Sequence, residues 1–250
     1  MTNAYFVSDL HLRDSEDAKT LVFLRFLESL AENKDVTTRA THLFLVGDIF
    51  DLWVGGHDYF RKKFEKVVSA IRKVHDAGIE VHFFEGNHDL HLEIFWAQEL
   101  GLKVHADSAY FQLAGQTVRV EHGDLINPDD RGYLFLRGLL RNPIVKTLAL
   151  HLPGRLVTQI GERASGASRE YTSTAKGLQK DEIRQLIRRH AEVVFKKKPF
   201  DLLISGHVHI RDDIELDIEG RKFRSVNLGS WFDAPGAFFI SEAEARFIEL

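Results

Sequence analysis

Short apolar runs alternate with longer amphipathic segments through much of the chain. Four runs have the length and composition of buried strands, and they are residues 4–8, 42–46, 81–85 and 201–205. Between the first three runs, apolar side chains recur at helical spacing over residues 17–33 and 59–77. Strands that alternate with helices are typical of a mostly parallel sheet covered by helices.

The last part of the chain has a different pattern, in which strands follow one another across short turns. Residues 110–122 and 212–229 are predicted to form β-hairpins, and further strands are predicted at residues 237–241 and 245–250. We therefore predict an α/β (α+β) fold in which two mixed β-sheets pack as a sandwich flanked by helices. Because no repeat or linker divides the sequence, residues 1–250 are expected to form a single domain.

Composition narrows the class of function. The 250 residues are 44% hydrophobic and 28% charged, which is the balance of a globular protein with a sizeable core. The formal net charge of −4 argues against a general nucleic-acid-binding protein, because such proteins carry a basic excess. The sequence contains no cysteine, which excludes disulfides and thiolate metal sites.

The sequence also bears on the cellular compartment. The N-terminal stretch AYFVSDLH is predicted to be a strand and not part of a signal peptide. No apolar stretch is long enough and free enough of charge to span a bilayer. We therefore expect a cytoplasmic protein.

Side chains that bind metal ions follow the predicted strands. They are Asp9, His11, Asp48, Asn87, His122, His207 and His209. Ligands of open α/β sheets gather beyond the carboxyl ends of the strands, so these side chains can converge. Carboxylate, amide and imidazole groups together suit Mn²⁺, Fe or Zn²⁺. These side chains are too many for the coordination sphere of one ion. They suit two ions about 3.5–4 Å apart that share a bridging carboxylate.

Each cluster alone has an ordinary structural explanation. Asp48 after a glycine fits a helix N-cap or a turn, and Asn87 fits a turn former. His207 and His209, two residues apart, also fit a partly buried strand. Clusters that each follow an apolar strand have no common structural explanation, so the metal site is the favoured interpretation.

In this order the clusters resemble the calcineurin-like metallophosphoesterases. The pattern Asp-x-His, Gly-Asp, Gly-Asn-His-Asp, His and Gly-His-x-His extends from Asp9 to His209. The resemblance implies a metal-dependent phosphoesterase, whose family fold is the two-sheet sandwich predicted above. It assigns Asp9, His11 and His209 to a first divalent ion, Asn87, His122 and His207 to a second, and Asp48 to both. Mn²⁺ is the expected ion, with Fe and Zn²⁺ as alternatives.

The same resemblance assigns catalytic roles to His88 and Asp89. His88 is expected to donate a hydrogen bond to the phosphate or the leaving oxygen, and Asp89 to orient the imidazole ring. Asn87 and His88 then both lie against the substrate. Two cations neutralise the charge of a phosphate ester and lower the pKa of a water, while protein donors stabilise the charge that develops on its oxygens.

The segment between His122 and His207 indicates the substrate. Residues 131–161 contain no Asp or Glu but carry cationic side chains among many apolar ones. One interpretation is an ordinary helical hairpin packed on the core. The other is a helical cap inserted at about residues 125–175, with an apolar face for acyl chains or a membrane and a cationic face for phosphates. Its place between two ligand-bearing strands favours the cap.

The cap narrows the resemblance to the UDP-2,3-diacylglucosamine pyrophosphatases of lipid A synthesis. The similar stretches are GDIFDLWVGG, HGDLINPDDRGY, GERASGASRE and NLGSW. The resemblance implies cleavage of UDP-2,3-diacylglucosamine to UMP and 2,3-diacylglucosamine 1-phosphate, by an enzyme peripheral to the cytoplasmic face of the inner membrane. Asp130, Tyr133, Ser168 and Arg169 are then candidate substrate contacts. No obligate protein partner is inferred.

One departure from the family motif keeps an alternative open. The usual motif is Gly-Asn-Arg-Asp, and this chain has His88 in place of the arginine. A guanidinium keeps its charge, whereas an imidazole serves as a donor or an acid. The alternative is a related metallophosphoesterase acting on another nucleotide- or lipid-linked pyrophosphate or phosphodiester. A nucleic-acid phosphodiesterase is disfavoured by the lack of a long basic groove, and an inactive scaffold by the complete ligand set.

Overall fold

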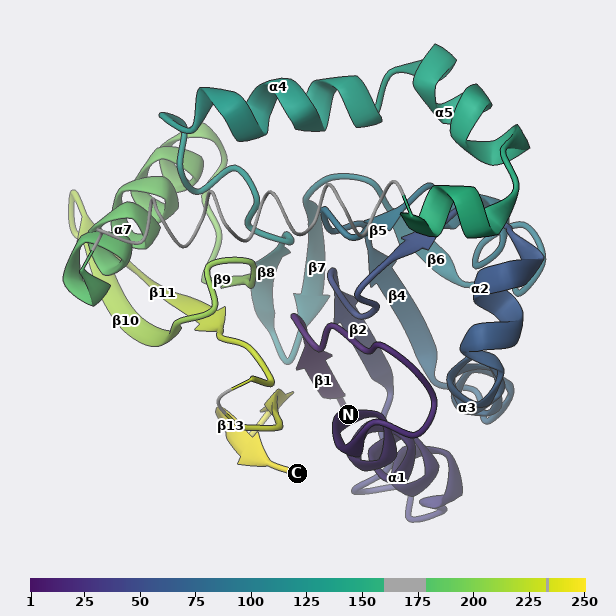
Figure 1. Ribbon diagram of the computed structural model, residues 1–250. Helices are drawn as coiled ribbons and strands as arrows, with labels where there is room; N and C mark the ends of the chain where they lie inside the picture. The colour runs from purple at the N-terminus through teal and green to yellow at the C-terminus, as the bar shows by residue number, and fades with distance from the viewer. Residues whose placement is uncertain (160–178, 233) are drawn as a thin grey trace.

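Two mixed β-sheets pack face to face between outer layers of helices in the computed structural model (Figure 1), which describes residues 1–159, 179–232 and 234–250. The six-stranded sheet has the order β13 (Ala245–Glu249), β12 (Gly236–Ser241), β1 (Asn3–Val7), β2 (His42–Val46), β4 (Glu80–Phe84) and β6 (Lys103–His105). The five-stranded sheet has the order β10 (Arg211–Ile218), β11 (Arg221–Leu228), β9 (Leu202–Ser205), β8 (Gln116–Val120) and β7 (Ala109–Leu113). The predicted fold class is confirmed.

The remaining elements are helices and one short ribbon. Strands β3 (Trp53–Val54) and β5 (Asp89–Leu90) pair in parallel beside the main sheets. The described helices include α1 (Ala18–Glu32), α2 (Asp58–Lys63), α3 (Glu65–Asp76), the 3₁₀ helix η1 (Leu92–Ile94), α4 (Arg131–Leu140), α5 (Pro143–His151) and α7 (Lys180–Lys197), and residues 154–159 are helical as well.

Alternation along the central strands produces the layers. In β2, Leu43 and Leu45 pack into the core that also contains apolar side chains of α1 and α3. Phe44 and Val46 point the other way, into a second core shared with β8, β9 and β11. Because successive side chains of a strand point to opposite faces, one apolar run supplies both cores. Helix α7 covers the outer face of the five-stranded sheet through a third cluster that includes Phe195.

The parallel strands determine where the candidate ligands meet. Strands β1, β2, β4 and β6 pair in parallel, and so do β8, β9 and β11. Within each sheet the carboxyl ends therefore lie at one edge, and the polar residues that follow β1, β2, β4, β8 and β9 are gathered there.

The predicted helix over residues 59–77 is divided into α2 and α3. Phe64 separates the two helices with φ −111° and ψ 26° and is fully buried. Its ring packs 4.5 Å from that of Phe50 and 6.4 Å from that of Trp53, measured between centroids. The change of direction between α2 and α3 keeps the Phe64 ring in the core. The rings that it packs against, those of Phe50 and Trp53, lie outside residues 59–77, so the apolar spacing within that segment does not reveal the break.

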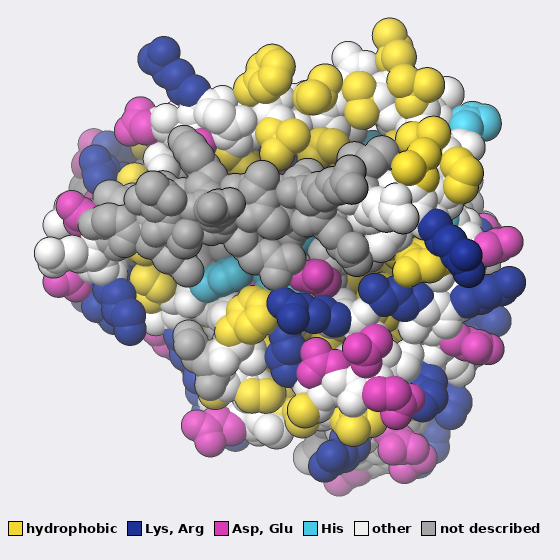
Figure 2. Space-filling view, viewed as in Figure 1, with side chains coloured by type: hydrophobic (Ala, Val, Ile, Leu, Met, Phe, Trp, Pro, Cys, Tyr) yellow, Lys and Arg dark blue, Asp and Glu magenta, His cyan; other side chains and the backbone are white. Residues whose placement is uncertain are grey.

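Helices α4 and α5 lie above the carboxyl ends of the strands, at the top of Figure 1. Apolar side chains gather on their outer surface in Figure 2, and the most exposed are Phe135, at 74%, and Ile144, at 71%. The inward side chains of the same helices are partly buried. These helices occupy the described part of the segment for which the sequence predicts a cap.

Candidate metal centre and active site

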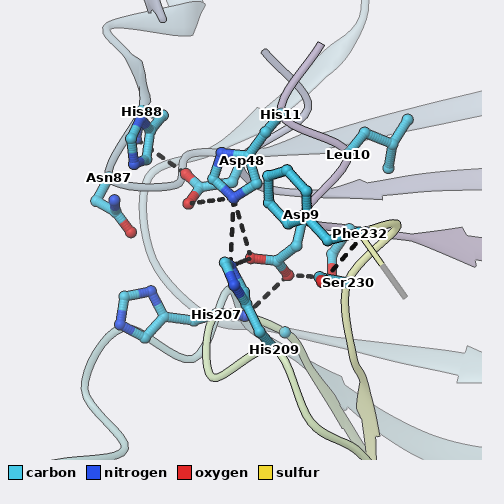
Figure 3. Close-up of polar contacts among 12 residues, drawn as sticks. Asp9, Leu10, His11, Asp48, Asn87, His88, His207, His209, Ser230 and Phe232 are labelled. Carbon is cyan, nitrogen blue, oxygen red and sulfur yellow. Dashed lines mark hydrogen bonds and ion pairs between the residues drawn. The ribbon is translucent and has the colours of Figure 1, made fainter. Parts of the chain in front are cut away.

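Strained turns carry most of the candidate ligands. The left-handed residues among them are Asp9 (φ 54°), His11 (φ 47°), Asp48 (φ 52°), His207 (φ 69°) and His209 (φ 57°). A non-glycine residue in this region costs on the order of 1–3 kcal/mol, and such residues persist where the surroundings hold them, often at functional sites. These turns follow β1, β2 and β9, and they bring their side chains to one place (Figure 3).

Two glycines let the backbone approach the carboxylates closely. A β-carbon on Gly86 would lie 2.1 Å from Oδ1 of Asp48, and one on Gly206 would lie 2.4 Å from Oδ2 of Asp9. Nearby donors also hold each carboxylate. The backbone N–H of His88 donates to Oδ1 of Asp48 at 2.9 Å, and that of His207 donates to Oδ2 of Asp9 at 2.9 Å.

The first group of candidate ligands is Asp9, His11 and His209. Nε2 of His11 lies 3.2 Å from Nε2 of His209, and Nε2 of His209 lies 3.2 Å from Oδ1 of Asp9. One donor atom from each residue lies within 4.8 Å of the other two. Oδ1 of Asp9 is buried yet accepts no hydrogen bond, despite the nearby imidazole.

The second group surrounds His122. Its Nε2 lies 3.3 Å from Oδ1 of Asn87 and 3.3 Å from Nδ1 of His207. Its Nδ1–H donates to the carbonyl of Val46 at 3.0 Å, so in the neutral ring Nε2 presents a lone pair to the site. Asp48, His122 and His207 also offer donor atoms within 4.8 Å of one another.

Asp48 lies between the two groups. Its Oδ2 is 3.8 Å from Nε2 of His11 in the first group and 3.6 Å from Nε2 of His122 in the second. The imidazoles of His11 and His207 are neutral near pH 7, the form that binds metal, because burial lowers the pKa of each to about 4. Burial also disfavours the charged form of His122, but the carboxylates of Asp48 and Asp9 outweigh it and raise its pKa to about 9.

The donor set fits divalent cations. Buried carboxylates, imidazoles and an amide oxygen converge, and a buried carboxylate oxygen of Asp9 has no hydrogen bond to satisfy it. An unsatisfied buried oxygen costs free energy that coordination of a cation recovers. The residues predicted as metal ligands thus lie together and have the chemistry that such ions require.

His88 lies at this centre, but its orientation differs from the prediction. Its Nδ1–H donates to the carbonyl of Asp51 at 2.8 Å, which points Nε2 toward the site. Asp89 does not orient the ring: its two oxygens accept from the backbone N–H groups of Ile49 at 2.7 Å and Phe50 at 3.1 Å. A carbonyl orients the imidazole instead, while buried Asp89 fixes the loop that carries Asp48. Burial and the neighbouring Asp48 raise the pKa of Asp89.

His88 also has a geometry that would suit a ligand. It forms a third group with His11 and Asp48 whose donor atoms lie within 4.8 Å of one another. The geometry permits both contact with a substrate and contact with a metal ion. The metal content of a His88 variant separates the two roles.

The candidate substrate contacts divide into three cases. Tyr133 lies at the site, with its ring 5.5 Å from that of His207 and its hydroxyl donating to Asp124 at 2.8 Å. Asp130 is the N-cap of α4 and accepts from the backbone of Tyr133 at 2.9 Å. Ser168 and Arg169 lie outside the described residues.

An apolar cavity of about 280 Å³ lies between α4, α5 and the core. Apolar side chains line most of it, among them Leu52, Leu136, Val145 and Leu148. It reaches the metal centre at Asn87 and His88 and the adjoining Asp124. Asp124 was not among the residues predicted for the site, although the HGD motif contains it.

Ion pairs hold α4 and α5 to the core. Arg137 pairs with Asp124 at 2.6 Å and with Asp107 at 2.9 Å, and Arg141 donates to Asp107 at 3.3 Å. Lys146 pairs with Glu93. These side chains do not form the expected cationic face for phosphates, because core carboxylates engage them.

Imidazole and carboxylate groups at the carboxyl ends of parallel strands, in a two-sheet sandwich, define a metal-dependent phosphoesterase. The family described as calcineurin-like phosphoesterase matches residues 3–211, and the chain belongs to this family. Membership makes the protein a metal-dependent hydrolase and implies divalent metal ions.

Curated relatives cover most of the chain. UDP-2,3-diacylglucosamine hydrolase from Enterobacter sp. (strain 638) is 31% identical over 226 residues, which are 90% of this chain and 90% of the relative. The protein of that name from Shigella dysenteriae serotype 1 is 33% identical over 227 residues, again 90% of each. A solved archaeal phosphodiesterase is 13% identical, with a TM-score of 0.47 over 100% of both chains.

Proposed function

We propose that this chain hydrolyses UDP-2,3-diacylglucosamine to UMP and 2,3-diacylglucosamine 1-phosphate. The observation that carries the proposal is the apolar cavity that ends at Asn87 and His88, inside the metal centre. A site for simple phosphate esters has no need of an apolar chamber, whereas a diacylated sugar phosphate does. The relatives named UDP-2,3-diacylglucosamine hydrolase support the same substrate.

The proposed centre holds two divalent ions, of which Mn²⁺ is the first candidate. Asp9, His11 and His209 bind one ion, and Asn87, His122 and His207 bind the other. Asp48 is shared, since its Oδ2 lies near an imidazole of each group. When bound, such ions neutralise phosphoryl charge and make an attacking water more acidic.

The chain's own side chains position the substrate. His88 directs Nε2 into the site because its Nδ1–H is committed to the carbonyl of Asp51. When the ring is protonated, Nε2–H donates to a phosphoryl or leaving oxygen and stabilises the charge that develops there. The ring of Tyr133 packs beside His207, and the hydroxyl of Tyr133 donates a hydrogen bond to Asp124. The acyl half then occupies the cavity beneath α4 and α5.

The outer surface of α4 and α5 supports a peripheral association with a membrane. Phe135, Leu139 and Ile144 are exposed there, and Figure 2 shows apolar side chains over the same helices. Within the described residues, the structure contains no helix with the length and apolarity needed to cross a bilayer. A protein peripheral to the cytoplasmic face of the inner membrane would take a lipid-linked nucleotide from that surface.

Hydrolysis of matched substrates tests the proposal. Mn²⁺-loaded protein should release UMP and the lipid phosphate from UDP-2,3-diacylglucosamine and act far more slowly on UDP-N-acetylglucosamine, which lacks the two long acyl chains. Val145→Trp should narrow the cavity and reduce only the first reaction, whereas Val36→Trp, at an exposed position away from the cavity, serves as a control. If the protein leaves UDP-2,3-diacylglucosamine intact but hydrolyses a simple diester rapidly, its substrate is instead another phosphodiester or pyrophosphate.

A further inference from the structure

The proposed substrate has two halves joined by one pyrophosphate, and the cavity accounts for only the acyl half. Among the described residues, Asn87 and His88 line the cavity, whereas Phe232 does not. Figure 3 shows Asn87 and His88 on one side of the centre and Phe232 on the opposite side, beside His11. A pyrophosphate whose acyl half fills the cavity therefore extends its nucleotide half toward Phe232.

Phe232 offers an aromatic surface at that end. Its side chain is 52% exposed. Its ring stacks on the imidazole of His11, with centroids 5.3 Å apart and planes inclined by 24°, and lies 5.9 Å from the ring of His209. A large exposed aromatic side chain directly beside candidate metal ligands has the properties of a stacking surface.

Hydrogen bonds donated by Trp231 and Phe232 hold the backbone that carries the Phe232 ring. The backbone N–H of Trp231 donates to the carbonyl of Asp9 at 3.2 Å, and its indole N–H donates to the carbonyl of Gly236 at 2.9 Å. The N–H of Phe232 donates to the hydroxyl of Ser230 at 3.4 Å. The backbone that carries the ring is therefore bound to the turn that carries Asp9.

A lysine accompanies the ring. Nζ of Lys19 lies 4.1 Å from the centroid of Phe232 and donates to the carbonyl of Leu10 at 2.7 Å. It also reaches the carbonyl of His11 at 3.5 Å. An ammonium group between an aromatic ring and the ligand loop is suited to a phosphate whose attached base contacts the ring.

We infer that Phe232 is the stacking platform for the nucleobase of the nucleotide half, and that Lys19 contacts the phosphate beside it. This role rests on the proposed function, because it requires a nucleotide substrate. Stacking of a base on an aromatic side chain tightens binding by about fivefold or more. The two halves of the substrate then leave the centre in opposite directions.

Equilibrium binding of product analogues tests this role. Calorimetry with Mn²⁺-loaded protein compares UMP with ribose 5-phosphate, which keeps the phosphate and sugar but lacks the base. The unaltered protein should bind UMP at least about fivefold more tightly. Phe232→Ala should abolish this difference, and Phe232→Tyr should retain it. Phe135→Ala removes a different exposed ring, on α4, and should leave the difference unchanged.

Metal content and thermal unfolding are measured on every variant. If Phe232→Ala loses metal or stability, Phe232→Leu decides, because it keeps apolar bulk without a flat ring and should also lose the preference for UMP. A protein that binds the two compounds equally, or a Phe232 variant without its ring that keeps the preference, overturns the inference. A Phe232-dependent preference for UMP in a protein that leaves UDP-2,3-diacylglucosamine intact refutes only the lipid substrate.

Discussion

Replacing Gly86 with alanine tests how closely the fold holds Asp48. The added β-carbon would lie 2.1 Å from Oδ1, 2.5 Å from the backbone nitrogen and 2.9 Å from Cγ of Asp48. The first distance is about 1.3 Å short of the 3.4 Å at which ordinary contact begins. Because the backbone nitrogen is also too close, a change of side-chain rotamer cannot relieve the contact, and the whole residue must move.

The size of this movement sets the expected loss. Metal–ligand distances hold to within about 0.2 Å, so a shift of this size removes Asp48 as a ligand. Misplacement by about 1 Å in an active site costs roughly 10²-fold in rate. Overpacking typically costs about 1–3 kcal/mol of stability. We expect Gly86→Ala to remain folded, to lose bound Mn²⁺ and to hydrolyse a chromogenic diester at least about 100-fold more slowly.

Gly138 provides the matched control. It lies in α4, and a β-carbon there meets no atom within 4 Å. Gly138→Ala should leave metal content and turnover unchanged and should raise stability by about 0.5–1 kcal/mol, because glycine is a poor helix former. Elemental analysis, the diester assay and thermal unfolding are applied to both variants. Full metal content and normal turnover in Gly86→Ala would refute the close packing on Asp48.

Three further predictions concern His88, Arg137 and His82. His88→Ala should keep both ions and lose about 10²–10³-fold in turnover, with partial rescue by His88→Arg; loss of an ion on elemental analysis would show that His88 is a ligand. Arg137→Ala breaks the pair with Asp124 and should slow turnover of the lipid substrate about tenfold or more while sparing a small diester. Equal losses on both substrates would give Arg137 a purely structural role. Burial lowers the pKa of His82 to about 4 in the folded protein, below its ordinary value of 6.5. Because the unfolded chain binds the proton more readily, stability should fall as the pH drops from 6.5 toward 4. Urea unfolding of His82→Phe should show a smaller loss over that range, and an unchanged loss would contradict this cause.

The strands and the residues behind them could be predicted because their signals are local. An apolar run of five residues followed by Asp, Asn or His is visible without any partner strand, and β2 begins and ends at the predicted residues. The parallel pairing then brings Asp9, Asp48 and Asn87 to one edge of the sheet. The apolar runs and the rule that parallel strands end at one edge of a sheet are enough to predict that these three residues lie together.

The contacts that refine the site are long-range, and the local pattern does not contain them. Asp89 was expected to orient His88, but backbone donors about 40 residues away along the chain engage its carboxylate. Arg137 of α4 pairs with Asp107, which precedes β7, and with Asp124, which follows β8. Phe232 meets His11 from the opposite end of the sequence. Such pairings depend on how the sheets pack, which composition and spacing do not determine.

The number of metal ions bound at full activity tests the central claim most directly. Chelated protein is titrated with Mn²⁺, and bound metal and phosphodiester turnover are measured on the same samples. Activity should reach its maximum as the bound metal reaches two ions per chain. Asp48→Ala, which removes the ligand shared by both groups, should lose more activity than any variant of a terminal ligand. Full activity with one ion per chain, or with none, would contradict a centre built from these side chains for two ions.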